Sequence, residues 1–510
     1  MRNIGKNTII GLLTILLATV CIPKVAEAAS WMRNNVGWWW QEDDGNYPVS
    51  EWKTINGKRY YFDEQGYMKT GWFWDGRDWY YLGNTDDGAM KTGWCKVGNE
   101  WYYLDKETGK IQTGWLSEGN ELYCLQSSGA MLANKWILTD AGWYYLGVNG
   151  NAITGWVWTN GYWYYLGQNK LMVENQWIND GSGWYYLGAG GRMHTGWIYE
   201  NDWYFLGSNG ALVLNGWAYD GSNWYYMGTD GRMVTGWQLI SGTWYKFAES
   251  GSMMSGWLYE GGVWYYLGHA DDGAMAVGGR CVNGTVYVFG NSGAMYANGT
   301  YTRNGCTFTA DASGAVSSCY TSGFPVVLQR PELPTGCEIT ALTMVLNYYG
   351  YPVSKTTMAS SYLPTVASGY TGNVDLDYYF CGNPYGSGIG CGAGALVTAA
   401  NSYLYSYGSV LRSVDLTGSS SGDVLARVAG GQPAVTMVTI GMAQRKTAYG
   451  WSTPSGKYVS WSENDHGVAV IGSDSSTVTV ACPLFGIKTY TKAQFEYAYA
   501  ARGNKAMILQ

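Results

Sequence analysis

The most constraining feature of this 510-residue sequence is a unit that repeats every 20 to 22 residues from about Trp52 to Met275. Each unit contains Gly-Trp, a polar turn, Trp-Tyr-Tyr-Leu-Gly, a second turn and Gly-x-Met, as in the stretch that begins at Gly196-Trp197. Aromatic and apolar residues that alternate between bends rich in Gly, Asn and Asp predict a short β-hairpin. One hairpin is unstable alone, but stacked neighbours bury a shared core. The sequence therefore predicts a β-hairpin solenoid over residues 29–277.

The remainder of the chain has a different composition, so we expect at least two domains. Of the 28 Trp residues, 26 lie between Trp31 and Trp264. From about residue 324 onward the repeats stop and a conventional globular composition begins. The net charge of −7 is mild and argues against nucleic acid as the main partner.

The first 28 residues have the pattern of a secretory leader. Arg2 and Lys6 precede an apolar run at residues 9–20, and Ala26-Glu27-Ala28 forms a small-x-small cleavage site. The apolar run is too short for a comfortable membrane span. A lipoprotein interpretation at Cys21 is disfavoured because the preceding valine is larger than the small residue such sites require. We therefore expect a secreted mature protein with no transmembrane segment.

Nine cysteines would remain in the mature chain, an odd number in an oxidising compartment. At least one thiol is then left over. The sequence does not determine the connectivity; the candidate pairs are Cys306 with Cys319, Cys381 with Cys391, and Cys95 with Cys124.

The repeated unit closely resembles the choline-binding repeats of bacterial cell-wall proteins, over nearly half of the chain. The resemblance implies cages built from the Gly-Trp tryptophan, the first aromatic residue of Trp-Tyr-Tyr and an aromatic residue of the next repeat, with a Met helping to close each cage. Aromatic faces attract a quaternary ammonium that no hydrogen-bond donor could hold. Carried onto this sequence, the expected cages are Trp72, Trp79 and Trp101; Trp156, Trp163 and Trp184; Trp197, Trp203 and Trp224; Trp217, Trp224 and Trp244; and Trp237, Trp244 and Trp264.

Two other interpretations of these aromatic residues stay open. The rings could form only the core of the solenoid, although Leu and Val would serve there, or they could bind a glucan; the Trp-rich unit favours choline. The array is also uneven, because Leu122 stands at a Trp position with Cys124 two residues on, so cages that use position 122 should be weak or lost. After Trp264, Gly278-Gly279 replaces Gly-Trp. We interpret residues 278–323 as degenerate repeats that cap the solenoid and lead into a linker.

A helix with a cysteine at its start is the clearest chemical signal in residues 324–510. After Cys337 the apolar residues fall at positions 339, 342, 345, 346 and 349, the spacing of a helix with one buried face. Gly336 suits a bent approach and Gly350 a C-terminal stop. The dipole and unpaired N–H groups of a helix N-terminus favour the thiolate, the nucleophilic form of cysteine. Cys337 is therefore either a catalytic nucleophile or a small buried residue that packs the helix start.

The only histidine after residue 324 is His466, which begins an apolar run. A cysteine nucleophile needs a base, and histidine is the usual one. The surrounding pattern predicts a first strand at residues 325–328, two more helices at 393–405 and 422–429, and then strands at 434–440, 467–471 and 477–481. Helices followed by an antiparallel sheet predict an α+β domain.

Residues 328–338, Leu-Gln-Arg-Pro-Glu-Leu-Pro-Thr-Gly-Cys-Glu, resemble the C39-like peptidases, a papain-type group of cysteine proteases. Residues 451–456, 464–466 and 483–487 add to the similarity, which covers all of residues 324–510. The resemblance implies that Cys337 is the nucleophile and His466 the base. It also implies that Gln329 is the side-chain oxyanion donor, helped by the N–H of Cys337.

One position departs from the family pattern. Relatives usually have Asp-Pro after the strand that follows the histidine, and that Asp orients the imidazole, whereas this sequence has Cys482-Pro483. A thiol orients an imidazole poorly, although a Cys–His dyad can retain activity. Cys482 could also form a disulfide with Cys337, which would lock the site. Asp474, in the turn before the second strand, is a weak substitute.

Together these features predict a secreted cysteine peptidase that is anchored at the cell wall through the choline of teichoic acid and needs no metal or other cofactor. It would cleave a peptide or isopeptide bond in a surface protein or in wall peptides. Two alternatives stay open. One is a wall-binding or adhesion protein whose peptidase fold is inactive because of Cys482. The other is an amidase that acts on peptidoglycan cross-links with the same Cys–His chemistry.

Overall fold

The computed structural model describes residues 28–269, 271–367 and 374–510. The expected leader, residues 1–28, therefore lies outside the described residues except for its last position. Contacts divide the chain into two units, one reaching to Gly196 and including Leu206–Leu212, the other formed by Trp197–Phe205 and Val213–Gln510. Each unit is described by itself. Among the described residues, no helix combines the length and the apolar character that a membrane crossing needs.

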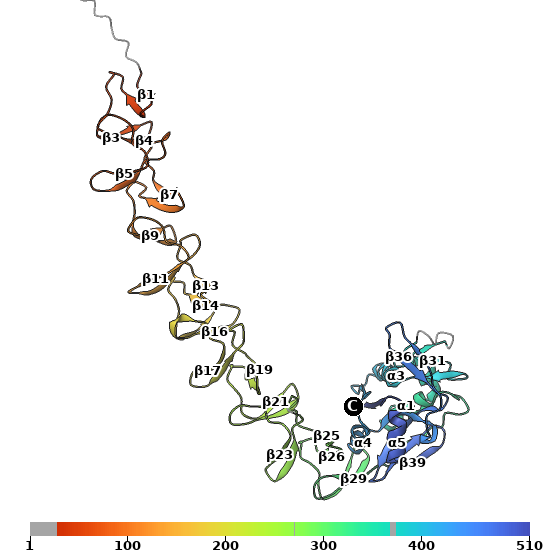
Figure 1. Ribbon diagram of the computed structural model, residues 1–510. Helices are drawn as coiled ribbons and strands as arrows, with labels where there is room; N and C mark the ends of the chain where they lie inside the picture. Colours follow the sequence, from red (N-terminus) through yellow and green to blue (C-terminus); the bar gives the residue numbers. More distant parts are fainter. Residues whose placement is uncertain (1–27, 270, 368–373) are drawn as a thin grey trace, which may run out of the picture. The chain divides into compact units, whose positions relative to one another are not determined.

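The repeat region forms the predicted β-hairpins, each a pair of antiparallel strands (Figure 1). The earlier hairpins are β1 (Ser30–Arg33) with β2 (Trp38–Gln41), β3 (Glu51–Ile55) with β4 (Lys58–Phe62), β5 (Trp72–Trp74) with β6 (Trp79–Tyr81), β7 (Gly93–Val97) with β8 (Glu100–Leu104), β9 (Gly114–Glu118) with β10 (Glu121–Leu125), β11 (Lys135–Thr139) with β12 (Gly142–Leu146), β13 (Gly155–Thr159) with β14 (Tyr162–Leu166), and β15 (Gln176–Asn179) with β16 (Trp184–Leu187). After the short helix η1 (Ala189–Gly191) come β17 (Gly196–Tyr199) with β18 (Trp203–Leu206), β19 (Gly216–Tyr219) with β20 (Trp224–Met227), β21 (Gly236–Ile240) with β22 (Thr243–Phe247), and β23 (Trp257–Glu260) with β24 (Val263–Tyr266).

The Met of the repeat ties neighbouring hairpins together. The N–H of Met131 donates to the carbonyl oxygen of Trp101 at 2.8 Å, and Met172 makes the same bond to Trp143 at 2.8 Å. The Leu that follows Tyr-Tyr, such as Leu146, is fully buried. Each hairpin thus supplies backbone bonds and apolar side chains to its neighbour, as a solenoid requires.

Residues 278–323, which we expected to include a linker, form strands instead. β25 (Gly278–Val282) pairs with β26 (Thr285–Phe289), while β27 (Gly299–Arg303), β28 (Cys306–Ala310) and β29 (Val316–Thr321) join the sheet of the C-terminal domain. Cys306 and Phe308 on β28 are buried in the core of that domain. Small and apolar residues replace the repeat tryptophans here because this stretch packs against a globular core.

The C-terminal domain is the predicted α+β fold, built on a nine-stranded sheet in the order β27-β28-β29-β37-β34-β40-β33, with β38 pairing both β37 and β39. Its later strands are β33 (Ser413–Asp415), β34 (Ala434–Thr439), β37 (Asp465–Ser473), β38 (Thr477–Cys482), β39 (Gly486–Thr491) and β40 (Ala506–Leu509). Apolar side chains of α1 (Cys337–Tyr348) and α3 (Ala393–Ser406) cover one face of the sheet. Those of α4 (Ser421–Ala429) and α5 (Lys492–Ala500) cover the other. The core therefore has two layers, one on each side of the sheet.

The strand predicted at residues 325–328 is wrong, because these residues form no strand. Pro325 lacks an N–H for a ladder, and the segment is held by a side chain, since Lys355 Nζ donates to the carbonyl oxygen of Leu328 at 2.5 Å. The remaining short elements are α2 (Lys355–Thr357), η2 (Met358–Tyr362), β30 (Thr365–Val366), β31 (Phe380–Gly382), β32 (Gly388–Gly390), η4 (Ile440–Met442), β35 (Tyr449–Ser452) and β36 (Tyr458–Trp461).

Candidate functional site

Cys337 is the first residue of α1 and is almost completely buried where this helix packs on β37. Its Sγ–H donates a hydrogen bond to Glu338 Oε2 at 3.1 Å. Burial and the Glu338 carboxylate raise the pKa of the Cys337 thiol well above its ordinary value, although a hydrogen bond from the Gly467 backbone N–H acts in the opposite direction. The expectation of a thiolate at the helix N-terminus is therefore wrong for this arrangement, because burial outweighs the helix dipole.

His466 lies near the start of β37 with its ring against Cys482 on β38. The His466 Nε2 and Cys482 Sγ atoms are 3.2 Å apart. Ala469 pairs with Ala481, so the alternation of side chains along both strands directs His466 and Cys482 to the same face of the sheet. Burial lowers the pKa of His466 to about 4, so the imidazole is neutral at pH 7.

Gln329 bridges the segments that carry the two cysteines. Its backbone N–H donates to the carbonyl oxygen of Pro483 at 2.9 Å. Its side-chain Nε2 donates to the carbonyl oxygen of Pro334 at 2.8 Å. Its Oε1 is buried and has no hydrogen-bond partner in the described part of the chain. Gln329 is thus held between the residue after Cys482 and the loop before Cys337.

Of the four sequence-predicted residues of the catalytic set, His466 and Cys482 contact each other on the face of the sheet that α4 and α5 cover, and Cys337 lies against Gly467 on the face that α1 covers. The N–H that reaches Cys337 belongs to Gly467, the residue directly after His466. Within residues 28–269, 271–367 and 374–510, however, no hydrogen bond joins Cys337 to His466 or to Cys482. The same ranges hold no group of three or more His, Cys, Asp or Glu side chains placed to bind a metal ion.

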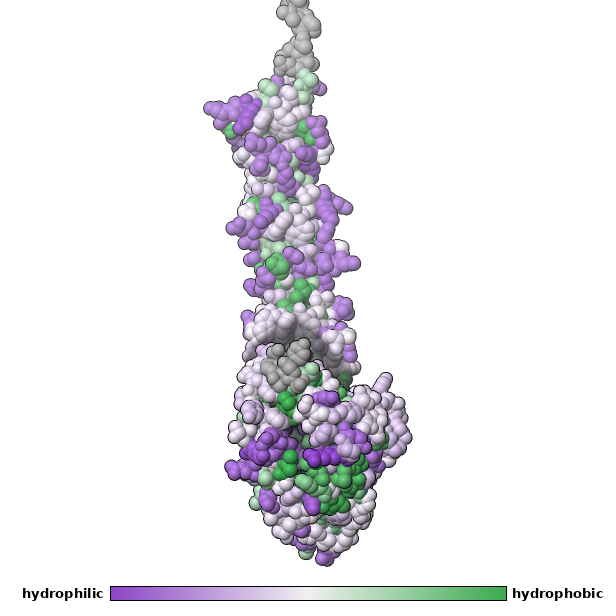
Figure 2. All heavy atoms as spheres, turned by 90° about the vertical axis from the view of Figure 1, so that its right-hand side faces the viewer, coloured by the Kyte–Doolittle hydropathy of each residue, from purple (hydrophilic) through white to green (hydrophobic). Residues whose placement is uncertain are grey.

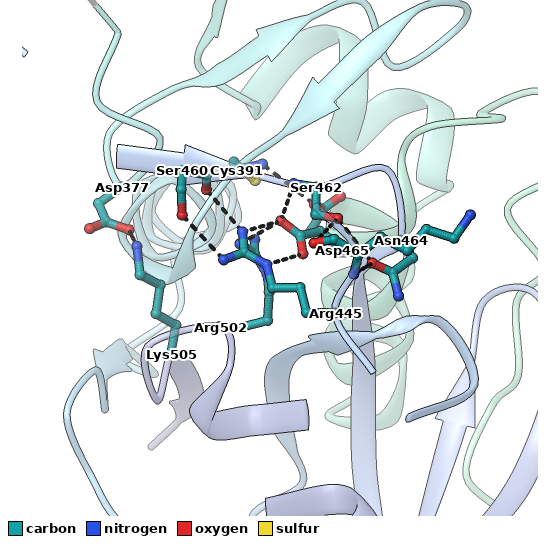
Figure 3. A network of polar contacts seen from close by, with 11 residues as sticks. Asp377, Cys391, Arg445, Ser460, Ser462, Asn464, Asp465, Arg502 and Lys505 are labelled. Carbon is teal, nitrogen blue, oxygen red and sulfur yellow. Dashed lines mark hydrogen bonds and ion pairs between the residues drawn. The ribbon is translucent and has the colours of Figure 1, made fainter. Parts of the chain in front are cut away.

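A buried ionic network beside His466 is absent from the sequence predictions. Figure 3 shows Arg445 and Arg502 both directed at Asp465, the residue before the histidine. Arg445 Nε lies 2.8 Å from one Asp465 oxygen and Arg502 Nη1 lies 2.7 Å from the other. The only sequence feature that could have indicated this network is the acidic residue Asp465 directly before the histidine. Its partners, Arg445 and Arg502, are distant from it in sequence and belong to no recognised motif.

All nine cysteines of the described residues are free thiols, so none of the candidate pairs is a disulfide in this structure. Cys306 and Cys319 do lie on paired strands, and their side chains hydrogen-bond to each other. Cys482 is within hydrogen-bonding distance of His466 and forms no disulfide with Cys337. The catalytic cysteine of the prediction is therefore not locked by a disulfide here.

Aromatic residues of the repeats line open pockets. One pocket of about 350 Å³ contains a near-perpendicular pair, Trp217 and Trp224, with ring centroids 6.3 Å apart. The ring of Tyr245 lies 5.0 Å from Trp217. The other lining residues are Met253, Asp271 and Asp272. Aromatic faces together with two carboxylates form an environment that attracts a quaternary ammonium.

The same arrangement recurs along the array. A second pocket, of about 320 Å³, is lined by Trp72, Trp79 and Tyr102. Near-perpendicular Trp pairs with a Tyr of the following repeat are Trp156 and Trp163 with Tyr185, Trp197 and Trp203 with Tyr225, and Trp237 and Trp244 with Tyr265. The first two residues of each predicted cage therefore lie side by side.

The third ring of each group differs from the prediction. We expected the first aromatic residue of the next Trp-Tyr-Tyr, that is Trp101, Trp184, Trp224, Trp244 and Trp264 in the five cages. The structure places the tyrosine one residue later against the Gly-Trp tryptophan, because neighbouring residues of a strand point to opposite faces.

Two further groups with this geometry were not predicted: Trp136 and Trp143 with Tyr164, and Trp257 and Trp264 with Tyr287. The repeat spacing would have found both, but Lys135 replaces the Gly of Gly-Trp in the first, and Val286 stands at the Trp position before Tyr287 in the second. On the face in Figure 2 the repeats are mostly pale and purple with scattered green, as expected where Trp and Tyr rather than aliphatic residues line the surface.

Two kinds of family model match the chain. The Peptidase C39 like family matches residues 321–507. The choline-binding repeat matches residues 49–92, 91–136, 214–257 and 234–279, and a cell wall binding repeat matches residues 154–169 and 175–193.

Among curated proteins, the uncharacterized protein YvpB of Bacillus subtilis is 31% identical over 188 residues, which are 36% of this chain and 72% of YvpB. Among solved structures, choline binding protein F from Streptococcus pneumoniae is 28% identical and the match covers 56% of this chain and 98% of that chain, with a TM-score of 0.30. A "putative C39-like peptidase" from Bacillus anthracis is 32% identical, and the match covers 38% of this chain and 96% of that chain, with a TM-score of 0.35.

Proposed function

This chain belongs to the C39-like peptidase family and carries choline-binding repeats that imply attachment to the teichoic acid of the cell wall, and we propose that it is a wall-anchored cysteine peptidase. The observation that supports the proposal is that Cys337 lies against Gly467, the residue after His466, while His466 contacts Cys482 and Gln329 links the segments that carry the two cysteines. The substrate would be a peptide or isopeptide bond of a surface protein or a wall peptide.

The hydrogen bonds suggest a role for each residue. If His466 Nε2–H donates to Cys482, the other ring nitrogen, Nδ1, is left unprotonated and serves as the base. Cys337 then gives its proton to Nδ1 as its sulfur attacks the scissile carbonyl carbon. The resulting oxyanion is stabilised by the Cys337 backbone N–H and a Gln329 Nε2–H. The imidazolium returns the proton to the leaving amine, and water hydrolyses the acyl-enzyme.

Two features of the arrangement oppose this chemistry. The Cys337 thiol must leave the Glu338 carboxylate, to which it donates at 3.1 Å. The imidazole must accept a proton although burial lowers its pKa to about 4. Turnover should therefore be slow unless the substrate displaces these buried contacts.

The direct test is hydrolysis of a panel of peptides by the full chain and by Cys337→Ala. We expect Cys337→Ala to reduce kcat/KM by at least about a thousandfold, because it removes the nucleophile. Trp451→Phe, which changes an aromatic residue of the same domain outside the catalytic set, is the control and should retain activity. Hydrolysis that persists in Cys337→Ala would remove this cysteine from the mechanism.

A second candidate function is a wall-binding protein whose peptidase fold is inactive. The hydrogen bond from Cys337 to Glu338, and the thiol of Cys482 in place of a carboxylate, favour it. Alkylation with iodoacetamide at neutral pH, followed by mass spectrometry of each cysteine peptide, separates the two functions. An active site predicts that Cys337 reacts faster than the buried Cys391, whereas equal, slow reaction of both favours the inactive protein.

A further inference from the structure

A pocket of about 320 Å³ in the C-terminal domain has a charged lining of one sign only. The charged side chains at its surface are Arg445, Lys457, Arg502 and Lys505. They come from the segment after η4, from the turn between β35 and β36, and from the turn between α5 and β40. A pocket of this size is large enough for a side chain or a peptide end.

The carboxylates that pair with these cations do not line the pocket. Lys457 Nζ contacts Asp375 at 2.8 Å and Asp377 at 2.7 Å, and Lys505 also bonds to Asp377. Both arginines share the carboxylate of a third residue, Asp465 (Figure 3). Three carboxylates therefore serve four cations, and the pocket keeps an excess of positive charge.

Arg502 has hydrogen-bonding capacity that the protein does not use. The residue is 8% exposed. Its Nε is buried without a hydrogen-bond partner among the described residues. An unpaired guanidinium N–H at such a depth is costly unless a ligand or water accepts its hydrogen bond. A carboxylate matches the geometry of a guanidinium better than other common peptide groups.

The pocket adjoins the candidate catalytic residues on two sides. Asp465, which holds both arginines, directly precedes His466. Gly392, which lines the pocket, directly follows Cys391, whose N–H donates to Glu338 Oε1 at 3.4 Å. Glu338 in turn accepts the hydrogen bond of Cys337. Arg502, which lines the pocket, is also close enough to Glu338 and Cys337 to interact with them electrostatically.

We propose that this pocket binds a carboxylate of the peptide substrate, so that the enzyme acts on acidic peptides. The inference rests on the proposed peptidase function, and it adds the substrate class. The carboxylate would accept hydrogen bonds from Arg502 and Lys457. It would hold the peptide while the scissile bond lies at Cys337.

The test uses the full chain with Cys337→Ala, which binds without turnover. The probes are octapeptides of Ala and Ser, blocked at both ends, in which a single Glu or a single Gln occupies each position in turn. A further probe has no Glu but a free C-terminal carboxylate, so that the two sources of a carboxylate are distinguished. Affinity is measured by calorimetry at low and at high salt.

We expect at least one Glu peptide, or the free-carboxylate peptide, to bind about tenfold more tightly than its uncharged counterpart, with the difference shrinking at high salt. Lys457→Gln, whose side chain is nearly half exposed, should reduce this preference to about twofold or less. Lys446→Gln is the matched control, since Lys446 is an exposed lysine of the same region that pairs with Glu463 outside the pocket. It should leave the preference unchanged.

The inference is overturned if every acidic peptide binds no better than its uncharged counterpart, or if Lys457→Gln keeps the full preference while its thermal unfolding matches that of the parent. Hydrolysis by the chain with Cys337 intact is measured separately. An acidic preference without any hydrolysis would support the pocket and contradict the peptidase function. Hydrolysis without an acidic preference would support the peptidase function and contradict the carboxylate-binding pocket.

Discussion

At the scale of single residues, the base strength of His466 depends on its neighbour at position 482. The Cys482 thiol is buried, and burial raises its pKa, so it is a neutral partner for the imidazole. A neutral thiol stabilises an imidazolium far less than a carboxylate does. Burial and the lack of a charged partner thus act together to keep His466 neutral.

We predict that Cys482→Asp raises the pKa of His466 toward neutrality and increases kcat/KM by about tenfold or more, because the carboxylate orients the ring and stabilises its charged form. The measurement is the pH–rate profile of peptide hydrolysis. Cys482→Ser, similar in size but uncharged, is the control and should follow the wild-type profile. If Cys482→Asp also has the wild-type pH–rate profile, the residue at position 482 does not assist the base.

Glu338 disfavours the thiolate form of Cys337, the proposed nucleophile. Its carboxylate, after burial, is the second cause that raises the pKa of Cys337. Glu338→Gln removes the charge and should lower the pKa of Cys337, which speeds alkylation by iodoacetamide several-fold at pH 7. The rate is followed by mass spectrometry on the Cys337 peptide across pH 6 to 10. Glu332→Gln, which changes an exposed carboxylate upstream of the helix, should leave the rate unchanged; a rate that also stays unchanged in Glu338→Gln would contradict the assignment.

The buried neutral His466 also predicts a pH dependence of stability. A histidine whose folded pKa is lowered to about 4 binds its proton more readily when unfolded, where the pKa is about 6.5. Its contribution is therefore fully present above about pH 6.5 and falls by about 3 kcal/mol as the pH drops to about 4. Urea unfolding of the C-terminal domain should show this loss, and His466→Gln should remove that part of it. If the free energy of unfolding falls equally with pH in the wild type and in His466→Gln, His466 is not the cause.

Two of the catalytic candidates were predictable because each lies in a short local pattern. Cys337 begins an amphipathic helix and His466 begins an apolar strand, whereas Gln329 and Cys482 were identified only through the resemblance to the C39-like peptidases. The ionization state was not predictable. The pKa values of Cys337 and His466 depend on burial by strands that are distant in sequence. The pKa of Cys337 also depends on the orientation of the Glu338 side chain, which the helical spacing does not determine. The arginine partners of Asp465 have no local pattern at all.

At the scale of elements, helix α4 explains why the Gly-Trp signal ends at Gly278-Gly279. α4 packs directly on β25 and β26. A Cβ added to Gly279 would overlap the carbonyl oxygen of Ala426 on α4, and one added to Gly430 would lie too close to the Gly279 backbone. A tryptophan at position 279 would prevent this packing. The Gly-Trp pattern is lost at this position because β25 packs against helix α4.

We predict that Gly279→Ala destabilises the C-terminal domain by about 1–3 kcal/mol, because the new methyl group must push α4 away from the strand. Gly386→Ala is the matched control, since its added Cβ meets nothing closer than an atom at 4.0 Å, and neither glycine has a left-handed backbone. Thermal unfolding of both variants is the measurement. Equal unfolding temperatures would show that the contact tolerates a methyl group.

The hairpins were predictable as elements because a period of two between bends is a strong local signal. The strands at residues 299–321 were not. Their partner, β37, lies about 150 residues later, and nothing in the local sequence indicates that β29 pairs with it through Cys319 and Ser473. The third ring of the cages has a different cause: side chains alternate along a strand, so the tyrosine and not the preceding tryptophan lies against the Gly-Trp tryptophan of the neighbouring hairpin.

At the scale of the whole molecule, the aromatic groups of the repeats recur along the chain, so their contributions to ligand binding should add up. We predict that the full chain is retained on a choline or tertiary-amine matrix and is released by free choline. Trp217→Ala should elute only slightly earlier, because the remaining cages still bind. The triple variant Trp72→Ala, Trp156→Ala, Trp217→Ala should elute much earlier, and Trp451→Ala, outside the repeats, should not shift. Retention on a glucan matrix but not on choline would contradict the ligand assignment.

The continuity of the last repeats with the catalytic sheet has a mechanical consequence. β29 pairs with the C-terminal end of β37, and the other end of β37 carries His466. Under the proposed function, a stretched wall would pull on this domain through the repeats, and β27–β29 are themselves strands of the sheet. Such a load would reach the strand that carries His466, the proposed base. The rate of such an enzyme would depend on force as well as on substrate concentration.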